Sequence, residues 1–427
     1  MGSVQYSNIY PSNSMHILTG LMAASTPFVA SFAPRDVTVV NGRWVNASGN
    51  VEHLRGMNVV VKGPPWLPAV DGTTHCGTTS SICTTFNEED AAYFRSQGWN
   101  LIRLGTIWAG AQPTPSLQLD PDFVERLHKI LELCHRYSIR VILDLHQDAM
   151  GTALCGEGVP MWYSQLHLAH LIGKPLVSTA SPAFGKCSLT DLAGWEQHAG
   201  DPQYNILNEC CTAINAPGNW GSALIPTLGV QLTFEHLVGT QVGRHAYATF
   251  VGLLTRAVAN HSAAIGIELM NEPPFYPEPI QASQLFDLYR ESYDAVRSVS
   301  DELAVGVADA GDVALSANDT HLPARVRDWL RNNTTRLMYN FHAYRSYPFP
   351  PFNVSVANAK ALAALWGGAV PVLTEFSGSD AKLADEAGVD WTIYQYNSYC
   401  SVPAQASPDP TSNCTPGDAC AFGACIT

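Results

Sequence analysis

The segment Ile265–Pro274 constrains the fold more than any other stretch of the chain. It reads Ile-Gly-Ile-Glu-Leu-Met-Asn-Glu-Pro-Pro, an apolar run of strand length that ends in Asn271 and Glu272 and is followed by two prolines. Proline has no amide hydrogen and a fixed φ, so these residues cannot continue strand pairing or open freely into a helix. The sequence therefore predicts a carboxylic acid held at the carboxyl end of a buried strand.

A second short run, Val370–Phe376, reads Val-Pro-Val-Leu-Thr-Glu-Phe and places Glu375 near its end. Two glutamates at the ends of two strands suit a hydrolase that uses a carboxylate pair. One carboxyl group must be protonated to help the leaving group depart, and the other must be ionised. Glu272 and Glu375 are therefore the candidate catalytic residues, and a buried structural carboxylate is the alternative interpretation of Glu272.

Eight strand-length segments alternate with helical segments, and polar residues collect at the carboxyl ends of the strands. This alternation predicts an α/β fold, the TIM (β/α)8 barrel, in which such strand ends carry the chemistry. The expected strands cover residues 53–61, 99–104, 140–146, 265–270, 303–308, 337–341, 370–374 and 391–396. Helices are expected near residues 87–98, from 120 onward, and near 247–258, 281–299, 323–331, 354–365 and 380–387.

Three further features complete the expected architecture. An N-terminal β-hairpin around Asn41-Gly42 would plug the bottom of the barrel. A long loop insertion follows strand three, from Gln147 to about Val238, where Gly, Pro, His, Trp and Cys replace regular periodicity. The C-terminal end is expected to be incomplete, because a Pro/Ser/Cys-rich tail follows Tyr396 in place of an eighth helix.

We expect one (β/α)8 domain over residues 34–400, a signal-like or disordered N-terminal segment over 1–33, and a Cys/Pro-rich tail over 401–427. His16–Ala33 is mildly apolar and ends in small residues, but it contains Pro27 and no lysine or arginine precedes it. The sequence thus leaves open whether this segment is a signal and whether it is cleaved. No stretch is as long and apolar as a membrane-spanning helix.

Composition argues against a nucleic-acid partner. The formal net charge is −14 and only 14% of the 427 residues are charged, so no large basic patch is expected to bind phosphate groups. The mean hydropathy is near zero, which allows a chain of this length to bury a substantial core. A neutral, polar ligand is the better expectation.

The eleven cysteines are concentrated in loops, which suits disulfide bonds. Cys134 differs, since it falls on the apolar stripe of an expected helix and is predicted to be a buried free thiol. Together with the glycosylation sequons, the other ten cysteines indicate an oxidising route, so we expect a secreted protein or one of the secretory/lysosomal pathway. The sequons begin at Asn46, Asn260, Asn318, Asn332, Asn333, Asn353 and Asn413.

Other polar side chains also lie in or at the ends of the expected strands. Arg103 lies in a strand that is otherwise apolar, where an unpaired guanidinium would be costly, so it should have a carboxylate partner. Asp144, His146 and Asp148 alternate along the third strand, which would put three candidate metal ligands on one face. A metal site is therefore a candidate interpretation of these three residues.

The Asn-Glu-Pro ending and the later strand ending in Glu-Phe resemble the retaining glycoside hydrolases of family five, in clan A. The resemblance implies that Glu272 is the general acid/base and Glu375 the nucleophile, with their carboxyl groups about 5–5.5 Å apart and no cofactor or metal. It also implies further roles for polar residues: Arg103 as partner of the nucleophile, Asn271 as a contact of the sugar 2-hydroxyl, His342 as a group that tunes Glu272, Tyr344 as a hydrogen-bond donor to Glu375, and His146 and Asp148 as contacts of sugar hydroxyls. A cluster of loop aromatics is the alternative interpretation of His342 and Tyr344.

Several strings are similar to one branch of that family, the endoglycoceramidases. They are Arg55–Pro65, Leu101–Trp108, Asp144–Asp148 and Cys155–Trp162. The resemblance implies that Lys62 and Asp148 grip the sugars and that the enzyme cuts between oligosaccharide and ceramide in a glycosphingolipid. The last strand departs from the branch, because Tyr394 stands where a tryptophan platform is expected, so Tyr394 or Trp391 must serve. A β-sandwich, which usually follows the barrel in this branch, is not expected from the sequence.

The sequence leaves alternatives for both substrate and activity. A β-glucosidase-, cellulase- or steryl-glucosidase-like hydrolase is the enzymatic alternative, and an inactive barrel that binds glycans is the other. A glycolipid or oligosaccharide is the expected substrate, and a monomer is expected. A transient contact with a membrane surface and a lipid-presenting activator remain open.

The insertion contains apolar residues that could form a hydrophobic lip for the lipid, because burying apolar surface is worth roughly 25 cal/mol per Å². A small helix packed on the side of the barrel is the alternative. The residues concerned are Met161, Trp162, Tyr163, Leu166, Leu168, Leu171 and Ile172.

Overall fold

The computed structural model describes residues 35–71, 85–154, 156–172, 228–274, 279–345 and 350–394, together with two short strands at 420–421 and 424–425. Within these residues, eight parallel strands close into a barrel in the order β3-β4-β5-β6-β7-β8-β9-β10, with β10 pairing back onto β3. The barrel strands are β3 Arg55–Val59, β4 Leu101–Gly105, β5 Arg140–Asp144, β6 Ala264–Glu268, β7 Ala304–Val307, β8 Leu337–Ala343, β9 Val370–Phe376 and β10 Asp390–Ile393. The predicted TIM barrel is confirmed.

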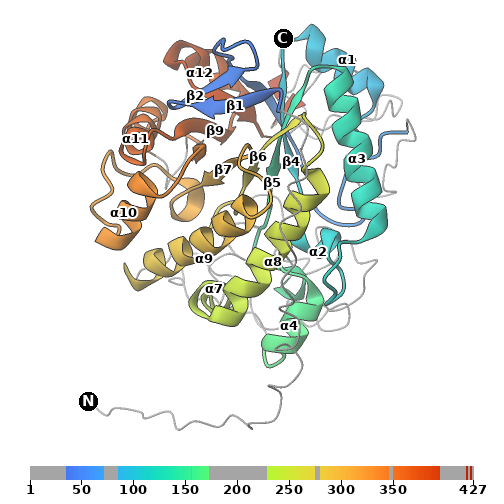
Figure 1. Cartoon of the computed structure of the whole chain (residues 1–427), viewed down its shortest axis with the longest axis vertical. Helices are drawn as coiled ribbons and strands as arrows, with labels where there is room; N and C mark the ends of the chain where they lie inside the picture. The colour runs from blue at the N-terminus through green and yellow to red at the C-terminus, as the bar shows by residue number, and fades with distance from the viewer. Residues whose placement is uncertain are drawn as a thin grey trace. The chain divides into compact units, whose positions relative to one another are not determined.

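Helices surround the strands of this barrel, as Figure 1 shows for α3, α8, α9, α10 and α11. Their bounds are α1 Glu88–Ser96, α2 Trp108–Ala111, α3 Pro121–Arg136, α4 Met161–His167, α7 Leu228–Gly239, α8 Gln241–Val258, α9 Pro279–Arg297, α10 Ala324–Asn332, α11 Phe352–Leu365 and α12 Ala381–Ala387, with 3₁₀ turns η1 Thr152–Leu154, η3 Ala310–Asp312 and η4 Gly378–Asp380. None of the helices in the described part of the chain has the length and apolar character needed to cross a bilayer.

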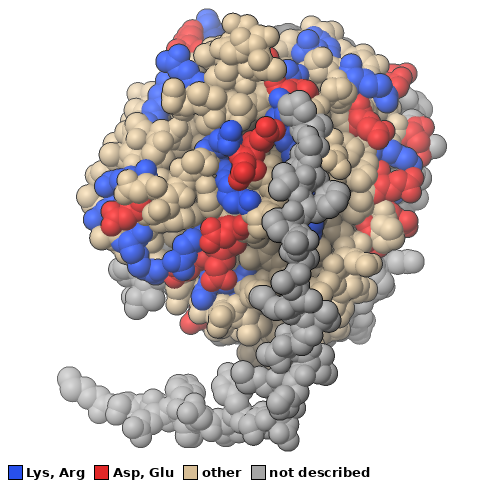
Figure 2. All heavy atoms as spheres, viewed as in Figure 1, with Lys and Arg blue, Asp and Glu red and all other residues tan. Residues whose placement is uncertain are grey.

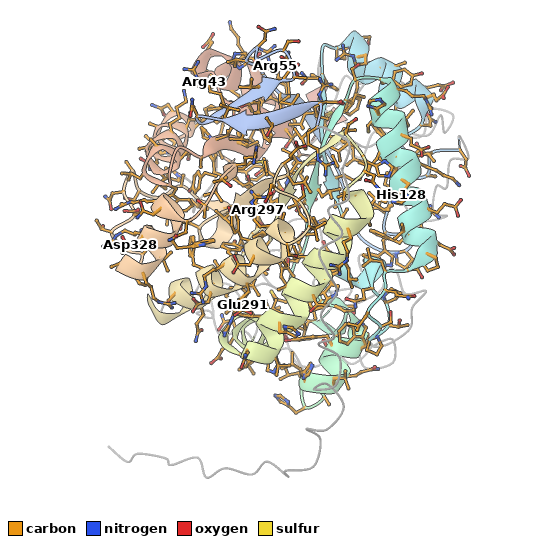
Figure 3. The ribbon with its side chains drawn as sticks, in the orientation of Figure 1. Arg43, Arg55, His128, Glu291, Arg297 and Asp328 are labelled. Atoms are coloured by element: carbon orange, nitrogen blue, oxygen red, sulfur yellow. The ribbon has the colours of Figure 1, made fainter. Side chains whose placement is uncertain are left out.

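Local sequence signals explain where the helices begin. Asn87 caps α1 through a reciprocal capping box with Asp90, and Asp120 accepts a hydrogen bond from the Phe123 N–H at the start of α3, where Pro121 takes the first position. At the end of α9, Arg297 donates hydrogen bonds to the carbonyls of Ser300, Leu303 and Thr335 and so fixes the turn into β7 (Figure 3). These contacts set the register between helix and strand.

The N-terminal hairpin closes one end of the barrel. Strands β1 Val37–Val40 and β2 Arg43–Asn46 pair around Asn41 and Gly42, which adopt the positive φ values of 51° and 71° that such a turn requires. Trp44 is 1% exposed and belongs to an apolar cluster with Leu101 and Ile265, at the beginnings of β4 and β6. The predicted plug at the barrel bottom is therefore confirmed.

The insertion after β5 is partly helical, which corrects the prediction of a loop. Helix α7 packs on α8 and α9 through Val230, Phe234, Leu237 and Val238, all of them buried at helical spacing. The sequence did not indicate this helix because α7 has little polar face, so no amphipathic period marks it. Residues 173–227 lie outside the described part of the chain, as does Cys155.

Cys134 is fully buried on α3 and is a free thiol, as predicted. Cys420 and Cys425 occupy paired positions of β11 (Cys420–Ala421) and β12 (Ala424–Cys425). The remaining cysteines, residues 1–34 and nearly all of the segment after Tyr394 lie outside the described residues, so the predicted disulfides, N-terminal segment and missing eighth helix stay predictions.

Candidate active site

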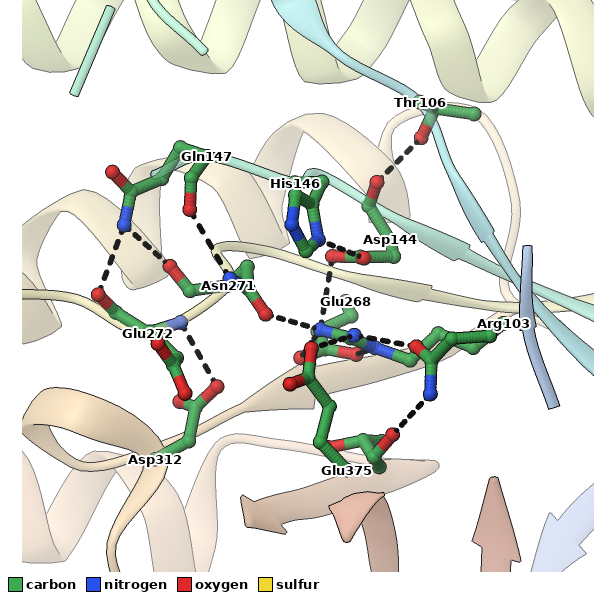
Figure 4. Close-up of polar contacts among 12 residues, drawn as sticks. Arg103, Thr106, Asp144, His146, Gln147, Glu268, Asn271, Glu272, Asp312 and Glu375 are labelled. Atoms are coloured by element: carbon green, nitrogen blue, oxygen red, sulfur yellow. Dashed lines mark hydrogen bonds and ion pairs between the residues drawn. The ribbon is translucent and has the colours of Figure 1, made fainter. Parts of the chain in front are cut away.

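Arg103 organises the polar interior at the carboxyl ends of the strands. Its side chain is fully buried in β4 and donates two hydrogen bonds to Glu268, at 2.7 and 2.9 Å. It also donates to Asn58 Oδ1 at 2.7 Å, to Asn271 Oδ1 at 2.7 Å and to Glu375 Oε1 at 2.8 Å (Figure 4). The buried charge is thus satisfied by hydrogen bonds on every nitrogen, which is the condition under which a guanidinium is tolerated in a core.

Glu375 is held on both oxygens. While Oε1 accepts the bond from Arg103, Oε2 accepts a hydrogen bond from the Tyr344 hydroxyl at 3.0 Å. Its side chain is only 6% exposed, and it lies in β9 beside His342 of β8. The carboxylate is therefore fixed in place by a permanent cation and a phenol.

Glu272 follows β6 and has a different environment. Its side chain is 26% exposed, and Oε1 lies 2.7 Å from His342 Nδ1. Burial and the nearby Asp148 carboxylate raise the pKa of Glu272 to about 7. Burial lowers the pKa of His342 to about 4, so the imidazole is neutral near pH 7. The arrangement keeps a proton on Glu272 that could be given to a ligand.

The two glutamates are close to each other. One carboxylate oxygen of Glu272, one of Glu375 and one nitrogen of His342 all lie within 4.8 Å of one another. In retaining glycosidases, the carboxyl groups of the nucleophile and of the general acid are about 5–5.5 Å apart. In inverting glycosidases, the carboxyl groups of the general base and of the general acid are about 6.5–9.5 Å apart. The observed proximity fits the shorter of the two separations and favours direct attack by one of the carboxylates.

A second charged cluster lies next to this pair. The Lys62 ammonium contacts the Asp148 carboxylate, lies 3.2 Å from Glu157 Oε1 and lies 5.8 Å from the ring centre of Tyr394. His146 stacks on Tyr394 with 6.5 Å between ring centres. Although burial alone would raise the pKa of Asp148, the Lys62 charge holds that pKa well below its usual range. The cluster presents charged groups and an aromatic face, which suits hydroxyl-rich ligands.

The structure corrects the prediction that Trp391 could serve as the platform under a sugar. Its indole is 3% exposed, donates a hydrogen bond to Asp385 of α12 at 2.9 Å and packs edge-on against Phe376. Side chains alternate along a strand, and Trp391 occupies a position of β10 that faces the helices instead of the barrel interior. Tyr394 just beyond the strand contacts the charged cluster instead.

The alternating Asp144, His146 and Asp148 do not converge on one point as a metal site would require. His146 lies between the two carboxylates, with Nδ1 at 2.7 Å from Asp144 and Nε2 at 3.3 Å from Asp148. Asp144 is also paired with Arg103 at 3.1 Å. His146, Asp148 and Glu157 bring ligand atoms within 4.8 Å, but a divalent cation there would have to compete with the Lys62 ammonium.

Comparison with known proteins agrees with this geometry. Residues 47–170 and 235–403 match the family described as Cellulase (glycosyl hydrolase family 5), which covers more than half of the chain. The chain belongs to glycosyl hydrolase family 5. The matched regions contain every barrel strand and both glutamates.

Two curated relatives carry lipid-related names. The chain is 26% identical over 259 residues to an endoglycoceramidase of Cyanea nozakii, a match that covers 60% of this chain and 43% of the relative. It is 25% identical to a glucosylceramidase of Cryptococcus neoformans, over 57% of this chain and 34% of that relative. The chain thus spans less than half the length of these curated relatives.

A solved structure has the same fold. It is the lactosyl-enzyme intermediate of endo-glycoceramidase II from Rhodococcus sp., which aligns with a TM-score of 0.55 and 19% identity over 85% of this chain and 75% of that one. At this identity the similarity establishes the barrel and not the substrate.

Several polar residues of this candidate site were not identified from the sequence. Glu268 and Asn58 lie in apolar strands, as Arg103 does, and the same rule about buried polar groups could have found them. Gln147 donates hydrogen bonds to the carbonyls of Asn271 and Glu272 at 2.6 and 2.9 Å. Asp312, which accepts a hydrogen bond from the Glu272 N–H, follows a glycine in a turn and carries no pattern that would single it out.

Proposed function

We propose that this chain is a retaining endo-type glycoside hydrolase that cleaves the bond between oligosaccharide and ceramide in glycosphingolipids. The observation that carries the proposal is the pair of adjacent glutamates in opposite environments. Glu375 accepts hydrogen bonds from Arg103 and Tyr344, whereas Glu272 has a pKa raised to about 7 and rests against a neutral His342. Such a pair supplies a nucleophile and a proton donor at the same bond.

In the first half-reaction, a Glu375 oxygen attacks the anomeric carbon while Glu272 gives its proton to the departing oxygen of the lipid. In the second, the Glu272 carboxylate takes a proton from water, the water oxygen bonds to the anomeric carbon, and Glu375 is released. Asn271 is fixed between Arg103 and the Gln147 carbonyl, and its amide has a second hydrogen that it could donate to a sugar hydroxyl.

The substrate class rests on the charged cluster and on the names of relatives. Lys62 and Asp148 lie near Glu272, and Tyr394 lies beside Lys62, so all three would contact the sugars. The relative from Cyanea nozakii is named an endoglycoceramidase, which supports a glycolipid as the substrate. Incubation with a fluorescent ganglioside tests this, with chromatography of the products. We expect an intact oligosaccharide and free ceramide, and none of either from Glu272→Gln or Glu375→Gln.

Two other outcomes of that experiment would favour the alternatives. Release of single glucose units from glucosylceramide would favour a glucosylceramidase, as the relative in Cryptococcus neoformans is named. Retention of the intact glycolipid on the protein without cleavage would favour a binding protein. Absence of both cleavage and binding would contradict the proposed substrate.

We also propose that the protein passes through an oxidising secretory compartment. The sequon residues Asn260, Asn318, Asn332, Asn333 and Asn353 are exposed, so glycans could be attached without disturbing the core. The intact mass of the protein from eukaryotic cells, before and after enzymatic deglycosylation and reduction with alkylation, tests this. An unmodified mass with eleven alkylatable thiols would contradict it.

A further inference from the structure

Asp312 is a buried carboxylate that lies beside Glu272 (Figure 4). It belongs to η3, the turn after β7, and Oδ2 accepts a hydrogen bond from the main-chain N–H of Glu272 at 2.9 Å. The Gly311 N–H donates to the carbonyl of Pro273 at 2.6 Å. Two hydrogen bonds in opposite directions therefore fasten this turn to the Glu272-Pro273 segment.

The main chain of Glu272 needs this support. Its φ is +36°, in the left-handed region where a residue with a side chain is strained, and such strain persists only where the surroundings determine it. Asp312 holds the Glu272 N–H, and Gln147 Nε2 holds its carbonyl oxygen at 2.9 Å. These two side chains set the direction in which the Glu272 carboxyl group points.

Asp312 also faces the imidazole that contacts Glu272. His342 Nε2 lies 3.3 Å from Asp312 Oδ2, while Nδ1 lies 2.7 Å from Glu272 Oε1. In the described part of the chain, neither His342 Nε2 nor Asp312 Oδ1 has a hydrogen-bond partner, although both atoms are buried. A neutral imidazole carries one N–H and one lone pair, so its tautomer decides which of the two carboxyl groups receives a hydrogen bond and which can donate one.

We propose that Asp312 is the positioning residue of the acid/base, and that Asp312, His342 and Glu272 act as one unit that shares a single carboxyl proton. When the proton is on Glu272, its hydroxyl donates to Nδ1 and the Nε2–H faces the Asp312 carboxylate. When the proton is on Asp312, its hydroxyl faces Nε2 and the Nδ1–H donates to the Glu272 carboxylate. Both forms hold the same number of protons. The inference rests on the proposed role of Glu272 as the acid/base.

The electrostatic surroundings support such coupling. Burial and the neighbouring Glu268 carboxylate raise the pKa of Asp312 well above its usual range, and Glu272 adds to the rise. Two interacting carboxyl groups lose their protons in separate steps that belong to the pair, with the last proton retained to higher pH. Among the described residues, the other titratable groups that interact with Asp312 are Arg103 of β4, Tyr289 of α9 and Tyr339 of β8.

Carboxyl ¹³C NMR titration of protein labelled at glutamate tests the proposal, with the Glu272 resonance assigned by its loss in Glu272→Gln. Asp312→Asn keeps the shape and an oxygen for the Glu272 N–H, but it cannot ionise. We expect Glu272 to titrate about one pH unit lower in this variant, the scale of interaction at which two sites titrate as a pair. The basic limb of kcat/KM on an aryl β-glycoside should move with it.

Asp319→Asn is the matched control, since Asp319 is also a buried aspartate but pairs with Arg331 at 2.8 Å and makes no contact with Glu272 or His342 among the described residues. It should leave the Glu272 titration unchanged. An identical Glu272 titration in Asp312→Asn and the wild type would overturn the proposal.

If Asp312→Asn does not fold, the wild-type titration decides, because a shared proton requires a two-step change of the Glu272 resonance and a single independent step would overturn it. The NMR measurement needs no turnover, so failure to cleave any glycolipid would count against the proposed function alone.

Discussion

At the residue scale, the site depends on two glutamates that have different surroundings. The Glu272 pKa is raised from 4.5 to about 7, chiefly by burial. The folded protein therefore holds this proton at pH values where the unfolded chain has released it. It binds more protons than the unfolded chain between these values, so this group makes the free energy of unfolding fall as pH rises through that window.

Activity should follow the same proton. We expect kcat/KM on a natural glycolipid to fall as pH rises above about 7, because Glu272 then lacks the proton it must donate. A substrate with an activated leaving group needs less acid assistance and should show a weaker fall. Rate profiles over pH for both substrates check this, and profiles that stay flat through pH 6–8, the window around that pKa, would contradict it.

Lys62 is the second residue whose removal should be informative. Lys62→Met would leave Asp148 and Glu157 as buried carboxylates without their cation, and breaking a buried pair costs about 3–5 kcal/mol. We expect a lower Tm and a kcat/KM reduced by roughly 10²-fold, as a loss of about 3 kcal/mol of binding would give. Lys129→Met is the control, because Lys129 is exposed and pairs only with Glu125 among the described residues. Equal behaviour of the two variants would contradict the assignment of Lys62 to the site.

At the scale of elements, helix α4 tests the hydrophobic lip. Leu166 is 64% exposed, whereas Tyr163 and Leu168 are buried in the core. The segment thus combines a packed side with an exposed leucine. Leu166→Glu should lower hydrolysis of ceramide-linked glycan several-fold and leave turnover of a soluble aryl glycoside intact, because only the first substrate has a lipid to hold.

Leu168→Glu separates the lip from structural packing. It places a charge in the core and should lower Tm and both activities together. If Leu166→Glu also reduced both activities equally, α4 would be a structural element, and the lip interpretation would be wrong.

The strands and most helices could be predicted from sequence because each carries a local signal. The strands are apolar runs of the right length, and α1 and α3 begin with capping residues. Helix α7 and the direction of Trp391 could not be predicted, since the first lacks a polar face and the second depends on which side of β10 faces the helices. Asp312 lies in the turn η3, and the path of this turn depends on tertiary contacts that no local sequence pattern marks.

At the scale of the whole molecule, the apolar cluster around the hairpin and the candidate active site lie at opposite ends of the barrel. The hairpin packs Trp44 under the strand beginnings, while the catalytic cluster lies at the strand ends. The face in Figure 2 shows acidic and basic residues interspersed, in keeping with a neutral ligand held in the interior cluster instead of on a charged surface.

Trp44→Ala should therefore separate stability from activity. Truncation of a buried tryptophan costs about 3–5 kcal/mol, so we expect a Tm several degrees lower. The value of kcat at a temperature where the variant is folded should be unchanged. A loss of kcat in the folded variant would show that the hairpin influences the site.

The proposed mechanism depends most on Glu375 as the nucleophile, and trapping the covalent intermediate tests this role directly. A 2-deoxy-2-fluoro-β-glycosyl fluoride should form a stable glycosyl-enzyme, because the activated leaving group allows attack while the fluorine slows hydrolysis. Mass spectrometry of the digested protein should find the sugar on the peptide that contains Glu375, and no adduct in Glu375→Gln. An adduct on another residue, or release of product with inverted anomeric configuration and no adduct, would contradict the role of Glu375 as the nucleophile.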